Sequence, residues 1–179
     1  MCMERDGVQI ATQNPKYFSA QIGMLLFLAA EAMFFAGLIS AFWVLRASLV
    51  SWPPDGQTRL PIFVTACNTV VLLFSGFMLW QARLKRKYWW WAVAAGFLFL
   101  IIQGSEWLKL MSFGFTAAHN TYAGLFYVLV GAHAAHVLGG LIFLILSRDA
   151  WAKDQPEPSL YYWTFVVLLW PLLYALVYF

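Results

Sequence analysis

Apolar residues fall into five long runs along the chain, and short polar or charged segments separate these runs. Each run contains at least the ~20 residues that an α-helix needs to cross about 30 Å of hydrocarbon. The runs lack the alternation of barrel strands, and only helices and closed barrels satisfy every backbone group in lipid. The pattern therefore predicts an all-α membrane protein. We expect a single transmembrane domain over residues 1–179, with five helices at about residues 18–45, 61–81, 88–107, 122–146 and 160–179.

Composition agrees with a membrane protein, because 63% of the residues are hydrophobic and only 11% are charged. Soluble domains carry about 25% charged residues. The polar N-terminus has neither the apolar core nor the small-residue cleavage site of a signal peptide, so we expect the first apolar run to be retained. Cys2 and Cys67 lie at different depths and in no metal-binding spacing. We therefore expect no disulfide, and we expect Cys67 to be a small packing residue.

Lysine and arginine are distributed unevenly between the two sides of the predicted bundle. One side carries Arg5, Lys16, Arg83, Lys85, Arg86, Lys87, Arg148 and Lys153, and the other carries Arg46, Arg59 and Lys109. The positive-inside rule places the first side in the cytoplasm, so the N-terminus is predicted to be cytoplasmic and the C-terminus periplasmic. A basic cluster beside a membrane span is typical of a topology signal and of contact with anionic lipid, rather than of a nucleic-acid site.

Glu31 lies in the middle of the first apolar run. An ionised acid at the centre of a bilayer costs at least ~2.5–3.5 kcal/mol, so such a residue normally faces a protein interior, has a partner or is protonated. Two roles remain open for it: a protonated acid that donates to a neighbouring helix, or a group that handles protons. Arg46 ends the same run, and its position makes it a candidate for contact with a lipid headgroup.

The fourth run contains His133 and His136, three residues apart and hence predicted on one helix face, among several glycines and alanines. Small residues let another helix approach closely, so we expect a packing seam with cross-helix hydrogen bonds to both imidazoles. Ligation of a metal or haem is the alternative. Two histidines do not complete a four-coordinate site, and His119 is expected in an outer loop, so no metal site is predicted.

We expect Glu31 to bond to the fourth helix, with His136 as the preferred partner and His133 as the second choice. Glu106 lies at the outer end of the third run beside Lys109, which favours a pairing at the surface or interface. The remaining polar residues of the second and third runs are read as hydrogen-bonding contacts between helices: Thr69, Ser75 and Gln103.

Several motifs occur in order along the chain: AAEAMFFAGLISAFWVLR, WPP, NTVVLLFSG, QGSEW, GFTAAHNTYAGLFYVLVGAHAAHVLGG and YWTFVVLLW. Together they resemble the third subunit of the haem–copper respiratory oxidases, the cytochrome c oxidase subunit 3 family. The resemblance covers all five runs. The chain is similar to the shorter bacterial form of the family, which has five helices and lacks the first two helices of the longer form.

The resemblance implies an auxiliary subunit of a proton-pumping terminal oxidase that reduces oxygen to water, in the bacterial inner membrane. The haem and copper belong to partner subunits, and no cofactor is expected in this chain. The family's third subunit packs against catalytic subunit I, holds phospholipid in a cleft, and supports assembly and sustained proton uptake. Glu31 matches the family's membrane-embedded acid, and His133 and His136 match its paired histidines.

The last run departs from the family pattern. The family usually has a histidine after the tryptophan and an aspartate three residues later, whereas this chain has Thr164 and Val167. The change leaves open a partner of a nitric oxide reductase or another variant respiratory complex. A second class of function is a small ion or proton transporter, in which Glu31 and the histidines would line a path. The absence of an internal repeat in the sequence argues against a transporter built from inverted halves.

Overall fold

The computed structural model describes residues 15–48, 61–114, 121–152 and 157–178, and every regular element in these ranges is a helix. The helices are α1 (Pro15–Ala47), α2 (Ile62–Gln81), α3 (Lys87–Ser112), α4 (Thr121–Leu146), α5 (Arg148–Ala152) and α6 (Glu157–Tyr178). All but the short α5 are long and apolar enough to cross a membrane. The prediction of an all-α protein with five spanning helices is confirmed.

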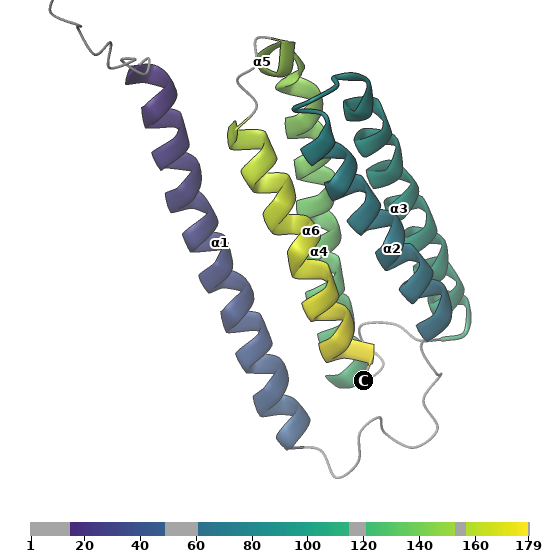
Figure 1. Cartoon of the computed structure of the whole chain (residues 1–179). Coiled ribbons are helices and arrows are strands. Elements are labelled where there is room, and N and C mark those ends of the chain that lie inside the picture. Colours follow the sequence, from purple (N-terminus) through teal and green to yellow (C-terminus); the bar gives the residue numbers. More distant parts are fainter. Residues whose placement is uncertain (1–14, 49–60, 115–120, 153–156, 179) are drawn as a thin grey trace, which may run out of the picture.

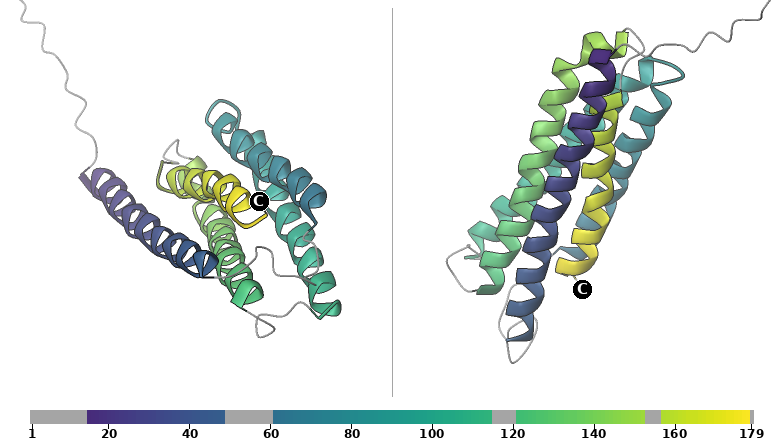
Figure 2. Two further views of the ribbon diagram at one scale, coloured as in Figure 1. Left: turned by 90° about the horizontal axis from the view of Figure 1, so that it is seen from below. Right: turned by 90° about the vertical axis from the view of Figure 1, so that its left-hand side faces the viewer.

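The helices form three layers, with α4 and α6 between α1 on one side and the α2–α3 pair on the other (Figures 1 and 2). α2 and α3 are joined by a short turn and pack along their length as a hairpin. α1 contacts only α4 and α6 among the described helices. Most of its surface is therefore free of contacts within the described part of the chain, as expected for a helix that faces lipid or a partner subunit.

Buried aromatic and branched side chains fill the space between α2, α3, α4 and α6. The largest completely buried residues include Trp163 and Trp170 of α6 and Phe99 of α3. Two helices come close together where one of them has a glycine at the contact. A Cβ built on Gly96 would lie 2.8 Å from Leu141 Cδ2 and 2.9 Å from the Trp163 ring, so only glycine fits there without a shift.

Several features of the helices differ from the sequence-based prediction. α1 begins earlier than expected and α3 continues to Ser112, because backbone hydrogen bonding continues beyond the apolar run. α3 then ends in front of Gly114, whose φ of 81° suits glycine at a helix end. The short helix α5 was not predicted. Cys67 is exposed on α2, so its expected role in packing is wrong for this chain; Cys2 and His119 lie outside the described residues.

Candidate functional site

The inward face of α1 presents Glu31 to the rest of the bundle. Partly or fully buried residues recur along α1 at alternating steps of three and four, the spacing of one helix face: Gln21, Met24, Leu28, Glu31, Phe35, Leu38 and Phe42. The residues of this face that pack against the hydrophobic core are all apolar, and Phe35 and Phe42 are almost completely buried. The packing of this seam therefore fixes the direction of Glu31 toward α4.

Glu31 meets His136 of α4, with 2.7 Å between Oε2 and Nε2. Each side chain is 18% exposed, so the pair is largely shielded. The contact expected between the two residues is thus present, whereas His133 does not take part in it. Tyr162 of α6 donates its hydroxyl proton to the backbone carbonyl of His136 at 3.3 Å. This hydrogen bond connects α6 to the same part of α4.

The hydrogen bond at the second ring nitrogen of His136 determines which atoms of the pair carry protons. Nδ1 lies 2.7 Å from the backbone carbonyl of Ala132, which can only accept, so Nδ1 carries a hydrogen. Nε2 then either accepts a proton from a neutral Glu31 or donates one to an ionised Glu31. The pair is electrically neutral in both arrangements. One proton is shared between the two residues, and no net charge is buried in the membrane.

Aromatic rings cover the imidazole of His136 on the α1 side. The Phe35 ring meets it edge to face, with centroids 5.0 Å apart, and the Phe34 ring stacks at 6.0 Å. Apolar rings lower the local dielectric and so strengthen the hydrogen bond to Glu31. The site is therefore a shielded acid–imidazole pair between two helices.

His133 occupies a different seam from His136. It is completely buried, its ring stacks on Trp170 of α6 with centroids 4.8 Å apart, and Phe99 of α3 meets it edge to face. Neither ring nitrogen has a hydrogen-bond partner among the described residues. The prediction of one shared histidine face and of a cross-helix bond to His133 is wrong in this part of the chain. A step of three residues turns the side chain by about 60° around the helix, which is enough to select another neighbour.

Polar side chains tie α2 to α3 and α6. Ser75 donates to the backbone carbonyl of Ala92 at 2.7 Å and accepts from Trp163 Nε1 at 3.1 Å. Trp170 Nε1 donates to Thr69 Oγ1 at 2.9 Å. Ser75 and Thr69 therefore bridge helices as expected.

Asn68 is a buried polar residue of α2 that sequence reasoning missed. Its Nδ2 donates to the backbone carbonyl of Phe99 at 3.1 Å and to Gln103 Oε1 at 3.3 Å. The signal was available, because Thr65, Asn68 and Thr69 lie at helical spacing with Ser75 and form one face. Gln103 bridges helices as expected, through Asn68.

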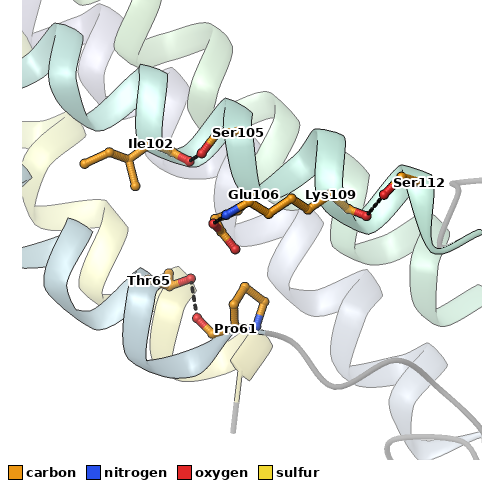
Figure 3. Close-up of polar contacts among 7 residues, drawn as sticks. All are labelled: Pro61, Thr65, Ile102, Ser105, Glu106, Lys109 and Ser112. Carbon is orange, nitrogen blue, oxygen red and sulfur yellow. Dashed lines mark hydrogen bonds and ion pairs between the residues drawn. The ribbon is translucent and has the colours of Figure 1, made fainter.

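Glu106 pairs with Lys109 at 2.6 Å, and the pairing agrees with expectation. The Glu106 carboxylate, however, is not on the surface. Its side chain is 9% exposed, whereas that of Lys109 is 64% exposed. Figure 3 shows Glu106 pointing from α3 toward the first turn of α2, where Thr65 donates to the carbonyl of Pro61 at 2.9 Å. The positive end of the α2 dipole favours an acid near this turn.

Arg46 lies in the last turn of α1, where a cation is favoured by the negative end of the helix dipole. Its guanidinium lies over the Trp43 ring, 5.4 Å from the centroid. The expected contact of Arg46 with a lipid headgroup stays a prediction. Arginine and tryptophan together are common at the depth of the headgroups.

The two positions that depart from the family pattern have different surroundings in α6. Thr164 is exposed on the outer face. Val167 is buried, and its Cγ1 would lie 2.9 Å from a Cβ at Gly76 of α2. A carboxylate in place of Val167 would be enclosed by the α2–α6 seam, so valine suits a close and apolar contact between these helices.

Among the described residues, no group of three or more histidine, cysteine, aspartate or glutamate side chains is placed to hold a metal ion. His136 is engaged on both ring nitrogens. The contact between Glu31 and His136 can share or transfer one proton, and it fastens α1 to α4.

Comparison with known proteins gives one consistent result. The family model described as cytochrome c oxidase subunit III matches residues 15–179. The cytochrome c oxidase subunit 3 of Thermostichus vulcanus is 32% identical over 177 residues, which cover 88% of this chain and 85% of that protein. The subunit 3 of a Synechocystis species is 35% identical over 176 residues, covering 87% and 73%. The probable subunit 3 of Mycobacterium leprae is 31% identical over 176 residues, covering 88% and 86%.

Proposed function

The chain belongs to the cytochrome c oxidase subunit III family and is a subunit of a membrane-bound oxidoreductase complex; from this premise we propose that its own role is auxiliary and non-catalytic. Oxygen reduction takes place in partner subunits that hold the haem and copper, and the complex pumps protons. This subunit packs against catalytic subunit I, retains phospholipid and supports sustained proton uptake.

The Glu31–His136 contact at 2.7 Å is the observation that carries the role we assign within that complex. α1 lies at the edge of the bundle and packs only on α4 and α6 among the described helices. A hydrogen bond between a buried acid and an imidazole therefore fixes the position of a helix that otherwise has few partners. We assign the pair to the stability of the assembled oxidase, and we assign the transfer of the shared proton to it as a secondary role.

A non-catalytic role also agrees with the state of the histidines. His136 is occupied by Glu31 and by the Ala132 carbonyl, and His133 is enclosed between aromatic rings. Binding a haem or metal through either histidine would require that ring to leave its present contacts. The alternative functions, a nitric oxide reductase partner and a transporter, receive no support from the family match.

Purification in a mild detergent tests the proposal. The chain should bring stoichiometric haem-containing subunits with it, and the complex should show the absorbance of reduced haem and consume oxygen. The control is the same preparation after dissociation in a harsher detergent, in which the separated chain should be colourless. A chain that purifies alone, without haem partners under any mild condition, would contradict the auxiliary role.

A further inference from the structure

Buried polar atoms without a direct partner gather in one half of the bundle, between the middle of α4 and the ends of α3 and α6. Among the described residues, these atoms belong to a set that we call the buried polar cluster: Asn68 Oδ1, Gln103 Nε2, Trp107 Nε1, both ring nitrogens of His133 and the Tyr178 hydroxyl. The one further atom of this kind in the described ranges, Trp89 Nε1, lies near the opposite end of the bundle, at the start of α3. Because buried polar groups in proteins almost always have partners, such a concentration indicates that a ligand completes the cluster.

Contacts between α2, α3 and α6 join the members of the cluster. Asn68 Nδ2 donates to Gln103 Oε1 at 3.3 Å, so the two amide groups meet. Gln103 also lies beside the Tyr178 hydroxyl, and Glu106 is near enough to act on that hydroxyl electrostatically. Gln103 and Glu106 are three residues apart on the buried face of α3. The cluster therefore continues toward the end of α3, where Glu106 pairs with the exposed Lys109.

His133 lies at the deep end of the cluster, and Phe99 connects it to Asn68. The carbonyl of Phe99 accepts from Asn68 Nδ2 at 3.1 Å, and its ring meets the imidazole of His133 edge to face. Beyond His133, the buried side chains of α4 are apolar: Val137, Leu141 and Leu144. The cluster therefore extends toward one end of the bundle and does not cross it.

The hydrogen-bonding needs of these atoms identify the ligand. Asn68 Oδ1 can only accept a hydrogen bond, Gln103 Nε2 and Trp107 Nε1 can only donate one, and the neutral imidazole of His133 does both. A cation would be repelled by the N–H groups, and an anion would be repelled by the amide oxygen. Water donates twice and accepts twice, and a buried water typically makes about three hydrogen bonds to such groups.

Space for water lies beside the cluster, between α3 and α4. Gln103 and Trp107 line a cavity of about 300 Å³, whose other described lining residues are leucine, alanine or glycine. A Cβ built on Gly104 would meet nothing within 4 Å, so the cavity is open next to Gln103. A water molecule takes up about 30 Å³ in the liquid, so the volume is ample. Hydrocarbon in this space would leave both N–H groups without an acceptor, whereas water supplies one.

We propose that a chain of internal water molecules fills the buried polar cluster, from Glu106 near the end of α3 to His133 in the middle of α4. The waters bridge the free atoms of Asn68, Gln103 and Tyr178 and give the imidazole its hydrogen-bond partners. Through them, the ring N–H of His133 exchanges its proton with the aqueous phase at this end of the bundle. The apolar half of the bundle ends the chain, so the waters form no path across the membrane. α1 contributes no residue, so the proposal is independent of the acid–imidazole pair on α1 and α4.

Water-edited solid-state NMR of the full chain in lipid bilayers tests the hydration, because it measures how fast polarisation passes from water protons to each side chain. The ring of His133 should receive polarisation early, and the loss of its signal in His133→Gln assigns it. The dry reference is the ring of Trp163, which is equally buried but whose Nε1 donates to Ser75. A His133 signal that rises no faster than the Trp163 signal would overturn the proposal.

Variants on two helices test the route by which water reaches His133. Gln103→Leu and Asn68→Leu remove polar atoms of the cluster at similar volume, and each should reduce the early His133 signal to the level of Trp163. The matched control is Ser105→Ala, which removes an exposed hydroxyl of α3 that bonds to the Ile102 carbonyl and should leave the signal unchanged. Circular dichroism should show equal helix content in all variants. An early His133 signal that persists in both leucine variants, or an equal loss in Ser105→Ala, would overturn the assignment of the water to this cluster.

Discussion

Replacing Glu31 should weaken the attachment of α1 without dismantling the bundle. Glu31→Ala leaves His136 Nε2 without its 2.7 Å partner in a site where the histidine side chain is 18% exposed. A buried polar group left unsatisfied costs about 1–3 kcal/mol. Glu31→Gln keeps one hydrogen bond, because the amide can donate to Nε2, and should cost less than about 1 kcal/mol. Both losses are small beside a total stability of about 5–15 kcal/mol, so the subunit should still assemble.

Stability of the full chain in detergent measures the first part of this prediction, through a double-mutant cycle of Glu31→Ala and His136→Ala. Cross-helix hydrogen bonds in membranes couple by about 0.6 kcal/mol on average and by about 1.7 kcal/mol at most, and we expect a value in this range. Met33→Ala is the control on the same helix, since Met33 is 75% exposed. It should change the stability by less than about 0.5 kcal/mol.

Oxygen uptake by the assembled complex measures the second part. The initial rate should persist in both Glu31 variants, because only groups near the reacting atoms stabilise the transition state of oxygen reduction. Inactivation over many turnovers should be faster in Glu31→Ala than in Glu31→Gln, since a loss of 1–3 kcal/mol raises the population of the detached helix about 5- to 150-fold. A complete and immediate loss of the initial rate, with haem content and assembly intact, would place Glu31 on an essential proton route and refute the structural role.

Further predictions concern packing and cofactors. Ser75→Ala should destabilise the chain by about 1–3 kcal/mol, because it removes the acceptor of Trp163 Nε1. The control Ser105→Ala loses only a local hydrogen bond within α3 and should cost less than about 0.5 kcal/mol, and thermal unfolding in detergent compares the two variants. Gly96→Ala should destabilise the chain by about 1–3 kcal/mol, because the added Cβ overlaps with Trp163. A Cβ at Gly104 meets nothing within 4 Å, so the control Gly104→Ala should be neutral or stabilise the chain by up to about 1 kcal/mol. Equal effects of the two variants in the same assay would contradict the packing described for Gly96. Metal analysis and absorbance of the isolated subunit should reveal neither haem nor stoichiometric metal, and either one bound through the chain's histidines would overturn this expectation.

The sequence predicted the spanning helices well, because the thickness of the bilayer sets the length of an apolar run independently of tertiary packing. It also identified Glu31, since a carboxylate in hydrocarbon is costly wherever its helix lies. The preferred partner His136 followed from depth alone. Helix ends were less predictable, as α3 shows by continuing to Ser112, because hydrogen bonding and capping rather than hydrophobicity determine where a helix stops.

The surroundings of individual polar residues were harder to predict than the helices. His133 and His136 have the same residue type and are close in sequence, yet one lies among aromatic rings and the other meets Glu31. The positions of the neighbouring helices decide between these environments, and a single sequence does not reveal those positions. Glu106 was placed at the surface or interface for the same reason, because the sequence does not show which helices cover its side chain, which is 9% exposed. Asn68 was overlooked although its helical spacing with Ser75 marked a polar face.

Oxygen consumption by the oxidase assembled with and without this chain tests the proposed auxiliary role most directly. The haem spectrum and the initial rate should be retained when the chain is absent, and activity should then be lost after fewer turnovers than in the complete complex. Return of the chain should restore the lifetime, and return of the Glu31→Ala variant should restore only part of it. An oxidase that holds its full haem content but reduces no oxygen from the first turnover without this chain would contradict the auxiliary role.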